Sequence, residues 1–124
     1  HQILNGNPPR LFEDSDKILR DFIYIDDVIQ ANIMACSAKK NGIYNVGTGA
    51  PRSFQEVVDI LQSELSTNHK TEYFANPYNG YQMHTQANIK LTQKFLNFKP
   101  LYTLEEGIKS YIPEIRELYG ESFD

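Results

Sequence analysis

The sequence predicts one mixed α/β domain, because segments with the pattern of strands alternate with segments of helical spacing along its 124 residues. Two capping boxes, Ser53 with Glu56 and Thr103 with Glu106, mark the starts of two helices. Hydrophobic residues make up 40% and charged residues 23% of the chain, which is typical of globular rather than disordered proteins. A chain of this length is expected to bury a single core.

The first half of the chain is predicted to form a strand, a helix and a second strand. Residues 20–25 are rich in aromatic and β-branched side chains, which suit a pleated surface. Asp26 and Asp27 offer N-cap oxygens to a helix that should run to about Ala38. A turn at Asn-Gly then leads into a short strand over residues 43–46.

The second half is predicted to be mainly helical. The first capping box opens a helix whose apolar positions continue to Leu65, and residues 71–74 could form another strand. Residues 76–82 contain Pro, Asn and Gly and should be irregular. Helical spacing returns over residues 87–95, and the second capping box opens a last helix that Pro113 should kink or divide.

Charge and hydropathy argue against two classes of partner. The formal net charge is −4 and the pI about 5.3, so the chain should weakly repel nucleic acid. No apolar run approaches the roughly 20 residues needed to cross a bilayer, and no signal peptide is evident at the start, so a cytoplasmic protein without membrane contact is expected. The only cysteine, Cys36, lies among apolar residues and is expected to be buried.

The motifs of cofactor binding and redox catalysis are missing from these residues. Gly47 and Gly49 give half of a G-x-G-x-x-G dinucleotide-binding turn, but Arg52 stands at the third glycine position. None of the eight tyrosines has a lysine four positions later, the spacing that would lower a catalytic tyrosine's pKa on one helical face. His69 and His84 are isolated, so no metal site is indicated. We therefore predict no catalytic, cofactor-binding or metal-binding residue here.

Several short segments, in this order, resemble the C-terminal half of the extended short-chain dehydrogenase/reductases. The Arg-Asp-Phe run and the Asn-Val-Gly-Thr-Gly turn recur among many nucleotide-sugar epimerases and dehydratases. The more particular segments, at residues 12–15 and 81–87, are similar to those of the ADP-glyceromanno-heptose 6-epimerases. The segments that carry the resemblance are residues 11–15, 17, 20–28, 43–49, 53–54, 81–82, 85–87 and 103–107. Asn88 departs from the family, which usually has Asp there.

The resemblance implies an NADP-dependent isomerase that epimerises C6 of ADP-heptose for the inner core of lipopolysaccharide. Residues 1–124 would be its C-terminal substrate-binding domain, with elements in residues 1–52 that complete a Rossmann sheet supplied by an N-terminal region. The chain starts at His1 without a methionine, so we expect a piece of a longer protein. Because the cofactor turn and the catalytic tyrosine and lysine are missing, we expect this piece to be inactive alone and to bind no NADP. The strand at residues 43–46 would lack its sheet, so we expect the chain to self-associate into a homo-oligomer or to be only marginally stable.

The family's substrate contacts fall on six residues of this sequence. By the resemblance, these substrate-binding positions are Phe12, Glu13, Asp14, Ser15, Arg20 and Tyr81. The chemistry suits a nucleotide sugar, because a guanidinium binds a diphosphate with two parallel hydrogen bonds and an aromatic face can cover a base or sugar.

Other interpretations of these residues remain open. Arg20 could instead pair with a neighbouring aspartate at the surface, and Phe12 and Tyr81 could be a core residue and an ordinary loop aromatic. The whole chain could act on a UDP-, GDP- or dTDP-sugar, or could be a non-catalytic interaction module.

Overall fold

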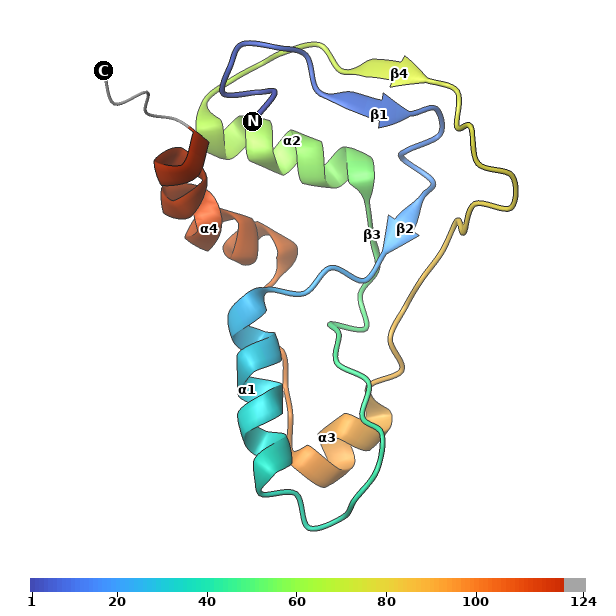
Figure 1. Ribbon diagram of the computed structural model, residues 1–124, viewed down its shortest axis with the longest axis vertical. Coiled ribbons are helices and arrows are strands. Elements are labelled where there is room, and N and C mark those ends of the chain that lie inside the picture. Colours follow the sequence, from blue (N-terminus) through green and yellow to red (C-terminus); the bar gives the residue numbers. More distant parts are fainter. Residues whose placement is uncertain (120–124) are drawn as a thin grey trace.

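The computed structural model describes residues 1–119 as an elongated mixed α/β body, which confirms the predicted fold class (Figure 1). The elements, in chain order, are β1 (Arg10–Phe12), β2 (Leu19–Arg20), α1 (Ile25–Cys36), β3 (Arg52–Ser53), α2 (Phe54–Leu65), β4 (Glu72–Phe74), α3 (Lys90–Leu96) and α4 (Leu104–Tyr119). Within the described residues, no helix has both the length and the apolar character that crossing a bilayer requires.

The strands form two small sheets rather than one large one. β1 pairs with β4 in parallel, and β2 pairs with β3 in antiparallel register. Figure 1 shows α2 beneath the β1–β4 pair with α4 beside it, while α1 and α3 lie together at the other end of the molecule. At the end where α1 and α3 lie, Ala31, Leu96 and Phe98 form a small buried hydrophobic cluster.

Both predicted capping boxes are present, and an arginine connects the helices that they open. The Ser53 hydroxyl accepts a bond from the Glu56 N–H while the Glu56 carboxylate accepts one from the Ser53 N–H. Thr103 and Glu106 make the same pair of bonds before α4. Arg52 forms ion pairs with Glu56 at 2.8 Å and with Glu105 at 2.7 Å, so the starts of α2 and α4 are held together.

The structure corrects the predicted boundaries around α1. Only Leu19 and Arg20 form a strand, and the helix begins at Ile25 with Tyr24, not an aspartate, as its N-cap residue. The Asp27 carboxylate is used elsewhere, because the N–H groups of Leu101 and Tyr102 donate to it. The helix ends at Cys36, whose side chain is exposed rather than buried.

Three further predictions about secondary structure were wrong or inexact. Residues 43–46 do not form the predicted strand, and the Ile43 side chain is 91% exposed. The helix predicted from residue 87 begins only at Lys90. Pro113 lies inside α4, which continues as one helix to Tyr119, so it does not divide that helix.

An exposed apolar stripe on α1 makes self-association the expected behaviour of the chain. Ile25, Ile29 and Ile33 recur every fourth residue, on one face of the helix, and are 54%, 47% and 59% exposed. Apolar side chains gathered in this way favour contact with another apolar surface. We expect light scattering to show a molecular mass that rises with concentration, and Ile29→Glu with Ile33→Glu to reduce that rise. A constant monomer mass over a wide concentration range would contradict this expectation.

Candidate functional site

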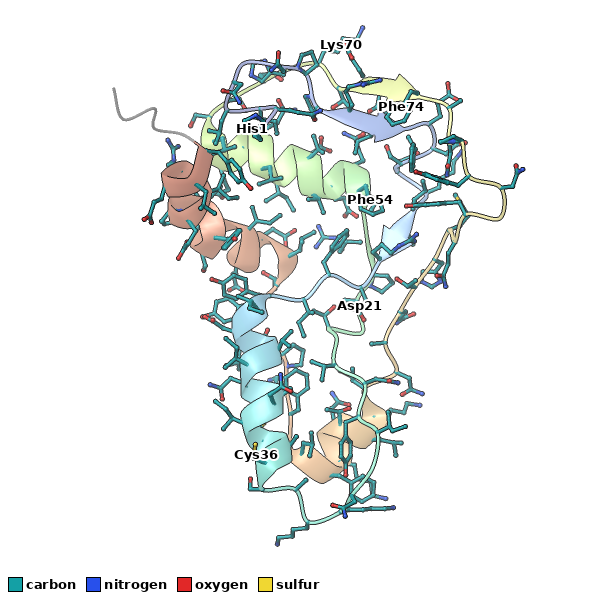
Figure 2. All side chains as sticks on the ribbon, in the orientation of Figure 1. His1, Asp21, Cys36, Phe54, Lys70 and Phe74 are labelled. Carbon is teal, nitrogen blue, oxygen red and sulfur yellow. The ribbon has the colours of Figure 1, made fainter. Side chains whose placement is uncertain are left out.

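Predicted site residues from distant parts of the chain meet at a pocket of about 190 Å³ next to the β1–β4 pair. Phe54 at the start of α2 and Phe74 in β4, both labelled in Figure 2, line it from two elements. The complete lining is Arg10, Leu11, Phe12, Ser15, Ile18, Phe54, Phe74 and Tyr81. Phe12, Ser15 and Tyr81 were predicted substrate contacts, so the fold brings three of the six to one cavity.

Arg20 lies beside this pocket and is held by backbone carbonyls rather than by aspartates. Its Nη1 donates to the Leu19 carbonyl at 2.8 Å and its Nη2 to the Gln82 carbonyl at 2.5 Å. The centre of the guanidinium lies 5.3 Å from the centroid of the Tyr81 ring and 5.7 Å from that of Phe54. A guanidinium has five N–H donors, so these contacts orient the group and leave donors for an anion.

Four aromatic rings form a connected cluster around Phe12. The ring centroids of Phe74, Tyr81 and Tyr78 lie 5.0, 5.5 and 6.2 Å from that of Phe12, all in edge-to-face geometry. Tyr78 and Tyr81 are stacked at 6.3 Å with an angle of 25° between their planes. Such a cluster offers flat apolar surface next to a fixed positive charge, which is what a nucleotide base beside its phosphates requires.

The remaining predicted residues lie on the turn that follows β1. The Glu13 N–H donates to the Phe74 carbonyl at 2.9 Å, and its side chain is exposed. Asp14 is also exposed, has a positive φ of 60°, and pairs with Lys17 at 2.6 Å. Ser15 is only 2% exposed and points its hydroxyl toward Gln55 at 3.5 Å. Glu13 and Asp14 therefore face solvent, whereas Ser15 lines the pocket.

The sequence did not indicate that Asp21 joins three separate segments. One carboxylate oxygen accepts from the N–H and the hydroxyl of Thr48, at 2.7 and 2.6 Å. The other accepts from the N–H groups of Gly49 and Ala87, both at 2.9 Å. Burial acts to raise the pKa of Asp21, but the hydrogen bonds from Thr48, Ala87 and Gly49 outweigh it and hold this pKa below its ordinary value. Figure 2 shows Asp21 near the middle of the molecule.

The tight packing at Gly47 supports a stability prediction. A Cβ atom there would lie 2.5 Å from the Ala87 Cβ and 2.8 Å from a carboxylate oxygen of Asp21. We expect Gly47→Ala to lower the free energy of unfolding by about 1–3 kcal/mol, the usual cost of overpacking. Gly42→Ala is the matched control, because its Cβ would meet only the Tyr44 ring at 3.6 Å. Equal urea midpoints for the two variants would contradict the prediction.

Other pocket residues were missed because their sequence signals pointed to different roles. Phe54 follows a capping serine, a pattern that predicts an apolar position of a helix, and Phe74 belongs to a predicted strand. Tyr78 does not line the pocket but packs against Phe12, and its sequence context indicates only an irregular loop. The available signal is the density of aromatic residues over residues 73–81, but no pattern in the sequence connects that segment to Phe12.

Comparison with known proteins finds sequence and structural similarity to epimerases. Residues 1–47 match the NAD dependent epimerase/dehydratase family. The structure resembles the ADP-L-glycero-D-manno-heptose-6-epimerase of Helicobacter pylori with 45% sequence identity and a TM-score of 0.83, over 93% of this chain and 35% of that one.

Two UDP-sugar epimerases show the same fold at lower identity. The UDP-glucose 4-epimerase of Thermotoga maritima, solved with UDP-glucose, has 26% identity and a TM-score of 0.86 over 94% of this chain and 37% of its own. The UDP-glucuronic acid 4-epimerase of Bacillus cereus, solved with UDP-glucuronic acid and NAD, has 27% identity and a TM-score of 0.84. The match covers 95% of this chain and 38% of that enzyme.

The chain spans between 35% and 38% of the length of these three solved proteins. It has the mixed α/β fold of the C-terminal part of the extended short-chain dehydrogenase/reductase epimerases, and its first 47 residues match the NAD dependent epimerase/dehydratase family.

Proposed function

We propose that the chain is the nucleotide-sugar-binding part of an ADP-glyceromanno-heptose 6-epimerase that acts in the cytoplasm on lipopolysaccharide inner-core precursors. The observation that carries the proposal is the position of the Arg20 guanidinium, 5.3 Å from the Tyr81 ring and next to the pocket that Phe12 lines. The 45% identity to the Helicobacter pylori enzyme supports ADP-heptose as the substrate.

In this proposal the chain holds the substrate and leaves the redox step to a bound nicotinamide. NADP would supply hydride transfer at C6 of the heptose. Arg20 would bind the diphosphate, Phe12 and Tyr81 would cover the base or sugar, and Ser15 would bond a hydroxyl through the pocket. A firm grip on ADP with a free sugar allows the sugar to present either face for hydride transfer.

The residues of this chain do not fit the cofactor itself. The N–H groups of Thr48 and Gly49, which would have to face a pyrophosphate in a dinucleotide-binding turn, donate to the Asp21 carboxylate instead. Arg52, at the third glycine position, forms ion pairs with Glu56 and Glu105. NADP would therefore be held by another part of the complete enzyme, and this chain would be inactive alone.

A second candidate is a related enzyme that uses a UDP-sugar, because two similar solved structures are UDP-sugar epimerases. We expect titration calorimetry of the chain to show ADP binding more tightly than UDP, GDP or dTDP, and no saturable binding of micromolar NADP. UDP binding tighter than ADP would favour the second candidate. If none of the four nucleotides binds, a non-catalytic interaction module is favoured. Saturable NADP binding would show that this chain holds the cofactor after all, against the expectation from the Gly47–Gly49 turn.

A further inference from the structure

Residues 81–87, here called the Tyr81 arm, carry one wall of the pocket and form no helix or named strand of their own. An irregular segment keeps its position only through bonds to other parts of the chain. The contacts that hold the Tyr81 arm therefore decide where the Tyr81 ring lies relative to Arg20.

The Tyr81 arm is held along its length by three consecutive residues, Leu19, Arg20 and Asp21. The Leu19 N–H donates to the Met83 carbonyl at 2.8 Å, and the Thr85 N–H donates to the Leu19 carbonyl at 3.1 Å. Arg20 donates to the Gln82 carbonyl at one end. Asp21 accepts from the Ala87 N–H at the other end.

Asp21 differs from Leu19 and Arg20 because it connects the Tyr81 arm to a second segment, residues 47–49. Its carboxylate also accepts the N–H groups of Thr48 and Gly49, and the carbonyl of Gly49 in turn accepts from the Gln86 side chain at 2.7 Å. The close packing at Gly47 leaves the carboxylate little room to turn. The end of the Tyr81 arm is thus fixed against the Gly47–Gly49 turn.

We propose that Asp21 is a positioning residue of the candidate site, which fixes the Tyr81 arm so that the Tyr81 ring and Arg20 face one ligand. This inference rests on the proposed function for its ligand and on the hydrogen bonds of Asp21 for its mechanism. Asp21 itself does not line the pocket.

The test is Asp21→Asn in the 124-residue chain, with ADP as the probe. The amide replaces one carboxylate oxygen by a donor group, so at least one pair of the N–H and O–H donors loses its acceptor. We expect ADP affinity to fall about tenfold, because the Tyr81 arm would no longer hold the Tyr81 ring and Arg20 toward one ligand; this fold-change corresponds to about 1.4 kcal/mol. Asp26→Asn is the control, because Asp26 is exposed in the first turn of α1 and should leave the affinity unchanged.

A double-mutant cycle separates positioning from general destabilisation. If Asp21 acts through the Tyr81 arm, Asp21→Asn should change ADP affinity less than about twofold once Tyr81→Ala is present. Amide hydrogen exchange of Thr85 and Ala87 should also become faster in Asp21→Asn. Additive effects of the two substitutions, or unchanged exchange at both amides, would overturn the proposal.

Two further outcomes distinguish failure of the proposed function from failure of the positioning role of Asp21. If wild-type chain binds no ADP but Asp21→Asn accelerates exchange at Thr85 and Ala87, the proposed function fails while the positioning by Asp21 stands. If Asp21→Asn does not fold, Gln86→Ala removes a milder, exposed contact of the same arm. It should weaken ADP binding only when Tyr81 is present, and an equal loss in the Tyr81→Ala background would overturn the proposal.

Discussion

Replacing Arg20 with alanine is expected to weaken ADP binding roughly ten- to a hundredfold, because a hydrogen bond to a charged group contributes about 1.5–3 kcal/mol. The side chain is already oriented by the Leu19 and Gln82 carbonyls, so little conformational entropy is lost when it binds an anion. In the complete enzyme, NADP affinity should stay nearly unchanged. Calorimetric titration with ADP and with NADP measures both effects.

Arg20→Lys should recover only part of the affinity, since a single ammonium group cannot form the two parallel bonds of a guanidinium. Arg116→Ala is the control for loss of positive charge, because Arg116 lies in the last turn of α4. Arg20 also donates to Gln82, so thermal melting of Arg20→Ala must show that the variant is folded. A folded Arg20→Ala chain with unchanged ADP affinity would remove Arg20 from the candidate site.

Local signals in the sequence predicted the helices that begin with their own caps. Ser53 and Glu56 bond to each other across one turn, as do Thr103 and Glu106, so neighbouring residues contain all the necessary information. The predicted strand at residues 20–25 needed a partner elsewhere in the chain, and the one at residues 43–46 needed the sheet expected from an N-terminal region. β-propensity describes a fit to a neighbouring strand and does not supply one. These predictions were therefore too long or wrong.

The candidate site shows the same limit more strongly. Residue types alone left Arg20 between an anion contact and a surface ion pair, and the family resemblance, not periodicity, indicated Phe12 and Tyr81. The sequence around Asp21 suggests only an ion pair with its neighbour Arg20. Its actual donors, Thr48 and Ala87, lie 27 and 66 positions away. No local pattern marks a carboxylate whose hydrogen bonds are all made after the chain has folded.

Replacing Asp27 with alanine is expected to lower the free energy of unfolding by about 2–5 kcal/mol, because the N–H groups of Leu101 and Tyr102 would each lose a charged acceptor. Asp27 is 1% exposed, and it accepts from Leu101 at 2.9 Å and from Tyr102 at 3.1 Å. These bonds hold the segment leading into α4 against the first turn of α1. Folded domains have a total stability of about 5–15 kcal/mol, so this loss would be a large fraction of the total and easily measured.

Urea denaturation followed by circular dichroism measures this loss, and Asp26→Ala provides the control one position away. Both aspartates lie in the first turn of α1, so both substitutions remove the same favourable charge from the positive end of the helix. Only Asp27 receives hydrogen bonds from residues 101 and 102. Asp27→Asn should give an intermediate loss, because its amide keeps one oxygen acceptor. Equal stability of the Asp26→Ala and Asp27→Ala variants would mean that the charge near the helix start matters and the two long-range bonds do not.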